Sequence, residues 1–303
     1  QRIDLATCGT CAGGSLFLGV PGSISQAASG SVQANGLEAV ATGNVALQTS
    51  AANDVITLAA RSTCGFAAFV DVNDLIVGTV GATSGVTADS AAGFDIIITG
   101  TNVDLQKGLF GSAGFSPINL TTRAGGSAIQ SSGDGTDRIV GDRMAVNGPG
   151  TFVLCEATND LNSIAATGTG AVTYVDADGI NLGFSGIDFV VSTGNANICA
   201  ASIVVRDDAN VAGNLTLNSA STITQTCGTV TASGLELIAA GAVTLNLANN
   251  VTNVVSAVAA PFVSLTNNAS AALTAENVTP ANGAIDPGET VTFTIDDNNG
   301  DHV

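Results

Sequence analysis

Six cysteines are the most reactive side chains of this 303-residue chain: Cys8, Cys11, Cys64, Cys155, Cys199 and Cys227. Cys8 and Cys11 have the Cys-x-x-Cys spacing of redox and zinc motifs, but no second such pair follows them. An even number of cysteines is typical of disulfide bonds in an oxidising compartment. The sequence therefore predicts structural disulfides. Six cysteines allow 15 full pairings and the spacing does not choose among them; a local Cys8–Cys11 pair and a Cys199–Cys227 bridge between neighbouring repeats are two of the options.

Aspartates in Gly- and Asn-rich loops are the second group of residues that could do chemistry, as ligands of a metal ion. Ca²⁺ accepts carboxylate and carbonyl oxygens in flexible geometry, so such loops are candidate calcium sites. None of them has a complete calcium-loop pattern, and exposed, solvated turns are the alternative interpretation. The candidate ligands are Asp176, Asp178, Asp296, Asp297 and Asp301.

The sequence offers few side chains for catalysis, with one lysine and one histidine. General acid–base and nucleophilic catalysts usually depend on such groups. The segment 134–143 (DGTDRIVGDR) concentrates both charge signs and could line the groove of a polysaccharide-acting enzyme. Its charged residues are Asp134, Asp137, Arg138, Asp142 and Arg143. We expect a projecting mixed-charge loop and no enzymatic activity.

Net charge and hydropathy argue against two classes of partner, nucleic acids and the membrane interior. The formal charge is −18, and a protein that binds nucleic acid needs a basic surface instead. The sequence has no run of about 20 apolar residues, so we expect no membrane insertion. Gln1 opens directly into sequence typical of a mature exported protein, and we expect a secreted, extracellular or cell-surface location.

Short β-branched clusters recur along the chain with turn residues between them, as at 45–47, 172–175 and 243–247. Clusters of this length, bounded by Gly, Asn, Asp and Ser, predict strands. Helical periodicity is nearly absent. The sequence therefore predicts an all-β protein.

Internal repetition decides between all-β architectures. Residues 32–47 (VQANGLEAVATGNVAL) and 230–245 (VTASGLELIAAGAVTL) share nine of sixteen positions. Each copy is too small to bury its apolar face alone, so stacked copies that share a core are the physical solution. This predicts a parallel β-helix, or solenoid, with an antiparallel β-sandwich as the alternative.

The repeats resemble a known family. A turn followed by Gly-Asn-Val-Ala-Leu-Gln (43–48) leads to Ala-Asn-Asp-Val (52–55), and a similar unit at 241–246 leads to Ala-Asn-Asn-Val (248–251). Across about 23–60 and 205–266 these units resemble the repeats of filamentous-haemagglutinin-type bacterial adhesins. The resemblance implies a right-handed β-helix with a structural role on a bacterial surface, and it carries no catalytic residues.

The C-terminal tail has a different character. Residues 277–303, with Asp-Pro-Gly-Glu-Thr before Val-Thr-Phe-Thr-Ile, resemble the start of an Ig-like bacterial surface repeat. We expect a solenoid over 1–274, a linker over 275–288 and an extended strand over 289–303 that either pairs with a neighbouring subunit or opens a further domain. The candidate assembly strand comprises Thr290, Val291, Thr292, Phe293, Thr294 and Ile295.

These observations predict an exported structural protein without a required cofactor. We expect identical subunits to join head to tail into a fibre, sheath or surface filament. A monomeric adhesin module that contacts a host or matrix surface, and a polysaccharide-acting β-helix enzyme, are the alternatives.

Overall fold

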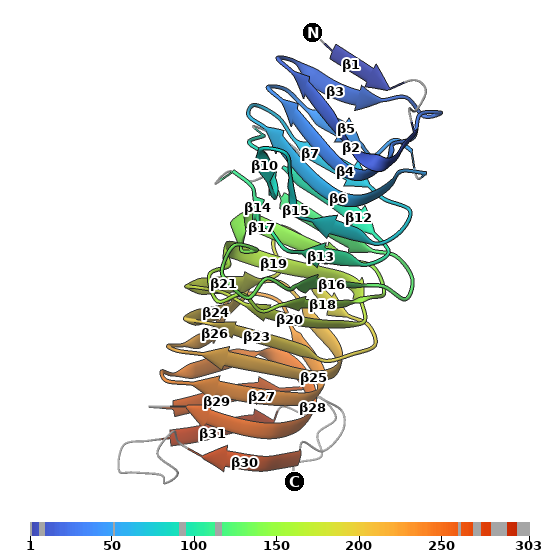
Figure 1. Ribbon diagram of the computed structural model, residues 1–303. Helices are drawn as coiled ribbons and strands as arrows, with labels where there is room; N and C mark the ends of the chain where they lie inside the picture. The colour runs from blue at the N-terminus through green and yellow to red at the C-terminus, as the bar shows by residue number, and fades with distance from the viewer. Residues whose placement is uncertain are drawn as a thin grey trace. The chain divides into compact units, whose positions relative to one another are not determined.

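A computed structural model describes residues 2–5, 10–50, 52–90, 95–112, 117–259, 262–268, 274–279 and 290–295. Every regular element in these ranges is a β-strand, and successive turns pair in parallel into about 11 solenoid turns (Figure 1). The predicted all-β parallel solenoid is thereby confirmed, and the antiparallel sandwich is excluded. The chain divides into two compact units, residues 1–161 and 162–303. In the described residues no helix is long and apolar enough to cross a membrane.

Unit 1 is built from short strands separated by tight corners. They are β1 (Arg2–Leu5), β2 (Thr10–Val20), β3 (Ser23–Gln26), β4 (Gln33–Ala41), β5 (Val45–Leu47), β6 (Asp54–Ser62), β7 (Ala67–Val70), β8 (Leu75–Val77), β9 (Thr79–Val80), β10 (Thr83–Ser84), β11 (Val86–Thr87), β12 (Ile96–Gly100), β13 (Val103–Leu105), β14 (Leu109–Phe110), β15 (Pro117–Thr122), β16 (Ser127–Gln130), β17 (Ile139–Asn147) and β18 (Thr151–Leu154).

Unit 2 repeats the same plan with several longer strands. They are β19 (Asp160–Thr169, which begins at the end of unit 1), β20 (Ala171–Val175), β21 (Gly179–Leu182), β22 (Phe189–Val191), β23 (Ala196–Ala200), β24 (Ser202–Val205), β25 (Ala209–Ser219), β26 (Ile223–Gln225), β27 (Val230–Ala239), β28 (Val243–Ala259), β29 (Phe262–Asn267), β30 (Thr274–Thr279) and β31 (Thr290–Ile295).

Parallel register stacks equivalent residues of successive turns. In unit 1, Leu37 of β4 lies opposite Leu58 of β6, one solenoid turn later in the chain. In unit 2, Leu215 of β25 lies opposite Leu235 of β27, again one turn later. All four side chains are buried. Because side chains alternate between the two faces of a strand, this register keeps one apolar row inside and one polar row outside.

The core of each unit consists of such rows. In unit 1 one row passes through Val45, Ala67, Ile96, Ile118 and Met144, all of them buried. In unit 2 one row passes through Val172, Ala196, Leu215, Leu235 and Val254. Burial of these side chains is the main favourable contribution to folding, because no single turn has enough apolar area of its own.

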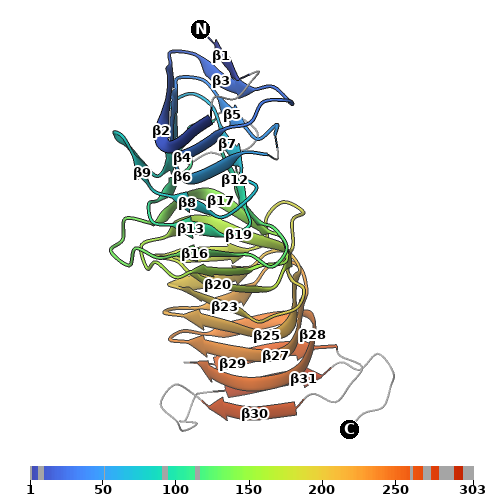
Figure 2. The same cartoon turned by 45° about the vertical axis from the view of Figure 1, so that its right-hand side comes forward.

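An antiparallel hairpin, β9–β10, interrupts the parallel pattern of unit 1 (Figure 2). The Glu38 carboxylate on the outer side of β4 accepts hydrogen bonds from the Ala82 backbone N–H and the Thr83 hydroxyl. The tip residue, Gly81, has φ +60° and approaches both Glu38 and Phe17 so closely that a Cβ atom would clash. The hairpin is therefore fixed across the outer surface of the sheet rather than within the solenoid wall.

The C-terminal strands differ from the expected linker and free strand. β30 pairs in parallel with β28, and β31 pairs in parallel with β29. The alternation of Thr-Val-Thr-Phe-Thr-Ile matches its partner, since Val291 and Phe293 lie in register with buried Val263 and Leu265. Both strands thus continue the solenoid of unit 2. Residues 280–289 and 296–303 lie outside the described part of the chain.

Candidate functional site

A pair of amide side chains, of which the asparagine is buried each time, recurs at the corners of the solenoid, and we call it the corner clamp. Each clamp consists of a glutamine at the end of one strand and an asparagine about one turn later. The three clamps are Gln26–Asn53, Gln130–Asn159 and Gln225–Asn249, and each glutamine Nε2 donates to the asparagine Oδ1, at 2.5, 2.8 and 2.8 Å respectively. The asparagine Nδ2 returns a hydrogen bond to the glutamine Oε1 in all three.

The clamp asparagine also satisfies the backbone at the corner. In the third clamp, Asn249 Oδ1 accepts from the Val230 N–H at 2.9 Å, and Asn249 Nδ2 donates to the carbonyls of Leu245 and Thr266 at 2.9 and 3.0 Å. The first clamp repeats this pattern with Val32, Leu47 and Val70 around Asn53. All three clamp asparagines are fully buried. Each clamp therefore closes a corner whose polar backbone groups would otherwise be buried without partners.

A second buried side chain stacks beyond two of the clamps. The Val251 N–H donates to Asn267 Oδ1 at 2.8 Å, and the Val55 N–H donates to Asp71 Oδ2 at the same distance. Asn267 is neutral, whereas Asp71 is a fully buried carboxylic acid. Burial raises the pKa of Asp71 from 3.8 to about 6, although hydrogen bonds from the Asn73 and Val55 N–H groups oppose the shift. The same corner is thus pH-sensitive in unit 1 and pH-insensitive in unit 2.

The terminal strands are the second candidate site. Within the described residues, β31 pairs with β29 alone and β30 pairs with β28 alone, so one side of each strand has no described partner. β1 and β2 at the start of unit 1 are similar, because they pair with β3 and β4 respectively. Ile3 of β1 lies in register with the buried Ile24. Both sets of strands carry the in-register apolar row of the core.

The charged segment 134–143 does not form a single surface. Asp134 lies in an exposed turn, where hydrogen bonds from Thr136 and Ser132 hold the pKa of its carboxyl group well below its usual range. Asp137 is buried and accepts from the Ser132 N–H at 3.0 Å. Arg138 and Arg143 have local partners. The Arg138 guanidinium lies 5.6 Å from the centre of the Phe110 ring, and Arg143 Nε lies 3.0 Å from Asp142 Oδ2. These contacts hold the segment together, and they do not gather its carboxylates around one groove.

The calcium candidates fall partly outside the described residues, because Asp296, Asp297 and Asp301 are not among them. Asp176 is buried and accepts hydrogen bonds from the Tyr174 hydroxyl at 2.7 Å and the Asp178 N–H at 3.1 Å. Asp178 is exposed and accepts from the Gly179 N–H. In the part of the chain that the structure describes, no three His, Cys, Asp or Glu side chains gather to hold a metal ion.

The expected cysteine bridge between repeats is absent. Cys64, Cys199 and Cys227 are free thiols. Cys199 lies on β23 opposite Asn218, whereas Cys227 lies in the turn after β26, so the turn spacing does not bring the two side chains together. Burial raises the pKa of the Cys199 thiol. Cys155 is exposed after β18, Cys8 lies outside the described residues, and for Cys11 the structure describes the backbone alone.

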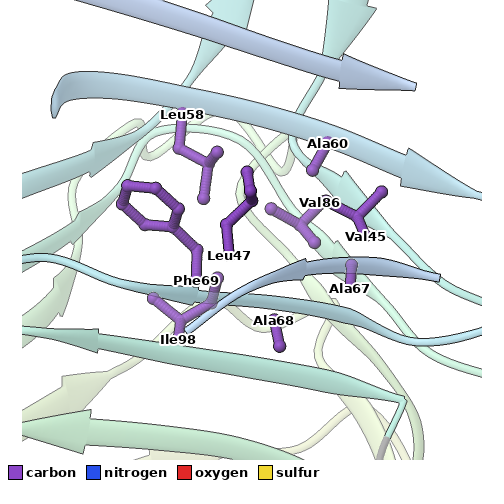
Figure 3. A pocket seen from close by; sticks show the side chains of 9 residues that line it. All are labelled: Val45, Leu47, Leu58, Ala60, Ala67, Ala68, Phe69, Val86 and Ile98. Carbon is purple, nitrogen blue, oxygen red and sulfur yellow. The ribbon is translucent and has the colours of Figure 1, made fainter. Parts of the chain in front are cut away.

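A small space inside the core of unit 1 is lined entirely by apolar side chains (Figure 3). It leaves no room for a water-sized molecule. Its lining residues are Val45, Leu47, Leu58, Ala60, Ala67, Ala68, Phe69, Val86 and Ile98. This space belongs to the packed core, and it offers a ligand neither volume nor polar contacts.

Sequence reasoning recognised part of the corner clamps. The Ala-Asn-Asp-Val and Ala-Asn-Asn-Val motifs contain Asn53 and Asn249, but their glutamine partners precede them by 27 and 24 residues. A search for glutamine at a strand end about one turn before each motif would have found them.

Comparison with protein-family models, curated proteins and solved structures gives no match.

Proposed function

We propose that this chain is a structural protein, the subunit of an exported fibre, sheath or surface filament that assembles head to tail. The observation that carries the proposal is the pair of terminal strand sets, each hydrogen-bonded on one side within the described residues. Backbone N–H and C=O groups along an unpaired strand are a template for another strand. Addition of a strand to such an edge is a common mode of protein recognition.

The register of the two strand sets favours this contact. β31 extends the sheet that contains β29, and its Val291, Phe293 and Ile295 positions align with the buried row of β29. β1 has the same alternation, with Ile3 and Leu5 aligned to buried positions of β3. Parallel addition of β1 from one copy to β31 of another would therefore continue both the hydrogen bonds and the apolar row.

Contact between different surfaces on the two copies favours an open polymer. A head-to-tail contact is heterologous, and unless its rotation closes a ring it repeats without limit. The formal charge of −18 opposes association at low ionic strength, and screening by salt reduces this repulsion. We therefore expect longer assemblies as the salt concentration rises.

Proline substitutions along β31 test the proposal. Successive N–H groups of a strand point to opposite neighbours, so Thr292→Pro and Phe293→Pro remove hydrogen bonds on opposite sides of β31. One variant should stop elongation in light scattering and electron microscopy with little change in melting temperature, because its lost N–H faces the incoming strand. The other should mainly lower the stability of the last turn.

The wild-type chain supplies the reference measurement. If it stays monomeric at high concentration and moderate salt, the head-to-tail function is wrong. Equal polymers from wild type and both proline variants would also contradict the proposal, because the assembly contact would then lie elsewhere.

A further inference from the structure

The connecting segment inside the second corner clamp is longer than its counterparts in the other two. In each clamp the glutamine Nε2 also donates to the backbone carbonyl two residues before the N–H that binds the clamp asparagine. These carbonyls belong to Gly30, Asp137 and Gly228, at 3.2, 2.7 and 2.9 Å respectively. The glutamine precedes them by 4, 7 and 3 residues. The second clamp thus contains an insertion, residues 131–137, which we call the clamp loop.

The insertion places a buried carboxylate where the other two clamps have glycine. Asp137 is 1% exposed, and its Oδ2 atom accepts a hydrogen bond from the Ser132 N–H at 3.0 Å, so the carboxylate faces the clamp loop. Its Oδ1 atom is also buried, and no described residue donates a hydrogen bond to it. Leaving a charged oxygen buried and unpaired is costly. Oδ1 therefore indicates a partner that the polypeptide itself does not supply.

The two basic side chains beside the clamp loop have partners other than Asp137. The guanidinium of the adjacent Arg138 lies 5.6 Å from the centre of the Phe110 ring. Lys107, the one lysine of the chain, lies on the preceding turn and donates from Nζ to the Thr136 hydroxyl at 2.6 Å. Neither contact neutralises the buried carboxylate, so the missing partner of Asp137 Oδ1 has to carry positive charge or a proton.

A second carboxylate converges on the same serine. The Ser132 hydroxyl donates to Asp134 Oδ1 at 2.8 Å, while the Ser132 N–H donates to Asp137. The Thr136 N–H and hydroxyl donate to Asp134 Oδ1 as well. The hydrogen bonds that described residues give to Asp134 thus all end on Oδ1, which leaves Oδ2 of this exposed side chain open. The clamp loop therefore presents two carboxylates with one available oxygen each.

The glycines of the clamp loop suit the binding of a calcium ion. Gly133 and Gly135 have φ angles of +62° and +76°, a conformation that glycine adopts without strain. They precede Asp137 and the buried Ile139 in the order G-x-G-x-D-x-I, which parallel β-helices use in calcium-binding turns. Ca²⁺ accepts carboxylate, carbonyl and water oxygens in flexible geometry, whereas Mg²⁺ requires a near-ideal octahedron. A flexible loop with two carboxylates therefore favours Ca²⁺.

We propose that the clamp loop is a Ca²⁺ site in which the ion is the partner of Asp137 Oδ1. Asp134 Oδ2, backbone carbonyls of the loop and water supply the other ligands. The loop contacts the preceding turn through Lys107, and the Gln130–Asn159 clamp joins it to the following turn, so a bound ion strengthens three successive turns of unit 1. This function goes beyond the head-to-tail assembly proposed above and does not depend on it.

Direct binding of Ca²⁺ to the full chain is the first measurement. Equilibrium dialysis with radioactive calcium in metal-free buffer of constant ionic strength should show one saturable site with a Kd of about 0.1–1 mM, the range of extracellular calcium modules. At about 5 mM Ca²⁺ the melting temperature of unit 1 should rise by about 2–4 °C. Mg²⁺ at the same concentration should give less than about a quarter of this shift.

Single substitutions locate the site. Asp137→Asn and Asp134→Asn should each weaken Ca²⁺ binding at least about tenfold, whereas Asp54→Asn, at an exposed carboxylate of β6 in the same unit, should change the Kd by less than about twofold. These three variants remove the same charge, so general attraction of cations to an acidic chain does not distinguish them. Lys107→Gln removes a positive charge beside the loop and should tighten binding at least about threefold.

Melting with and without calcium separates a metal site from a merely structural carboxylate. In chelator, Asp137→Asn should melt at or above the wild-type temperature, because it removes an unpaired buried charge. With Ca²⁺ present, this order should reverse. If Asp137→Asn fails to fold, replacement of 131–137 by Thr-Ser-Gly gives the connection the length it has in the third clamp. This shortened chain should fold and should lose the response to Ca²⁺.

Three outcomes would overturn the proposal. The first is a wild-type chain without saturable Ca²⁺ binding below about 10 mM, which is above the range of extracellular calcium modules. The second is a Kd that Asp137→Asn and Asp134→Asn change no more than Asp54→Asn. The third is an equal rise in melting temperature with Mg²⁺, which would assign the effect to non-specific screening. None of these outcomes bears on polymer formation, and a chain that stays monomeric while it binds Ca²⁺ through the clamp loop would contradict the assembly alone.

Discussion

The buried carboxyl group of Asp71 makes the stability of unit 1 depend on pH. The pKa of Asp71 is about 6 in the folded chain and near 3.8 when exposed. Between these values the folded state holds a proton that the unfolded state has lost, so the free energy of unfolding falls as pH rises from about 4 to 6. Above that window the charged form is buried at a constant cost.

Asp71→Asn should therefore stabilise unit 1 at neutral pH. The structural counterpart in unit 2 is Asn267, which shows that an amide suits this corner. We expect an increase of about 1–2 kcal/mol in the free energy of unfolding at pH 7, less than the full effect of the shift because Asn gives up one acceptor. Urea titrations at pH 4, 5, 6 and 7 should show that the free energy of unfolding of the variant no longer falls between pH 4 and 6. Asp160→Asn, which removes an exposed carboxylate of the same unit, should still show this fall.

At the scale of the element, the corner clamp is the feature most sensitive to substitution. Asn249→Ala leaves the Val230 N–H, two carbonyls and the Gln225 amide without their partner in a buried corner. We expect a loss of about 3–5 kcal/mol in the free energy of unfolding, because each orphaned polar group costs about 1–3 kcal/mol and some regain water. Asn250→Ala, at the exposed neighbour, should change stability by less than about 0.5 kcal/mol. Equal effects in urea unfolding would show that the clamp contributes little.

Strands and corners differed in how far sequence could predict them. The copies around Leu37 and Leu235 were recognisable because a stacked turn repeats its inward residues at nearly the same period. Gln26 and Asn53 were harder to recognise as partners, since their separation of 27 residues exceeds the spacing of 21 residues at which β4 and β6 repeat, and only a search that allowed for this difference would have paired them. The β9–β10 hairpin was missed because its four strand residues carry no apolar alternation and depend on Glu38, 44 residues from Ala82.

At the scale of the whole molecule, contacts between neighbouring turns should make unfolding a sum of local steps. A repeat array contacts mainly its nearest neighbours, so its units need not unfold together. We expect urea unfolding of the full chain to show two transitions, with Asp71→Asn moving one midpoint upward and Asn249→Ala moving the other downward. One sharp transition that both substitutions shift, coincident by circular dichroism and by hydrogen exchange, would contradict this expectation.

The β9–β10 hairpin shows how the chain tolerates added sequence. Val45 pairs with Ala67 and Ala67 pairs with Ile96 in the same buried row, although a longer stretch of chain separates the second pair than the first. The additional residues leave the wall between β8 and β11 and return to it, where the Gly85 N–H donates to the Gly78 carbonyl at 2.8 Å. This hydrogen bond closes the inserted segment at its base, so the number of residues between Gly78 and Gly85 can change without a change in the register of the wall strands. Evolution can change what is displayed at such a position, and an engineer can graft a foreign peptide there, without redesigning the buried row that passes through Val45, Ala67 and Ile96, provided that the burial of Val80 in the hairpin is kept.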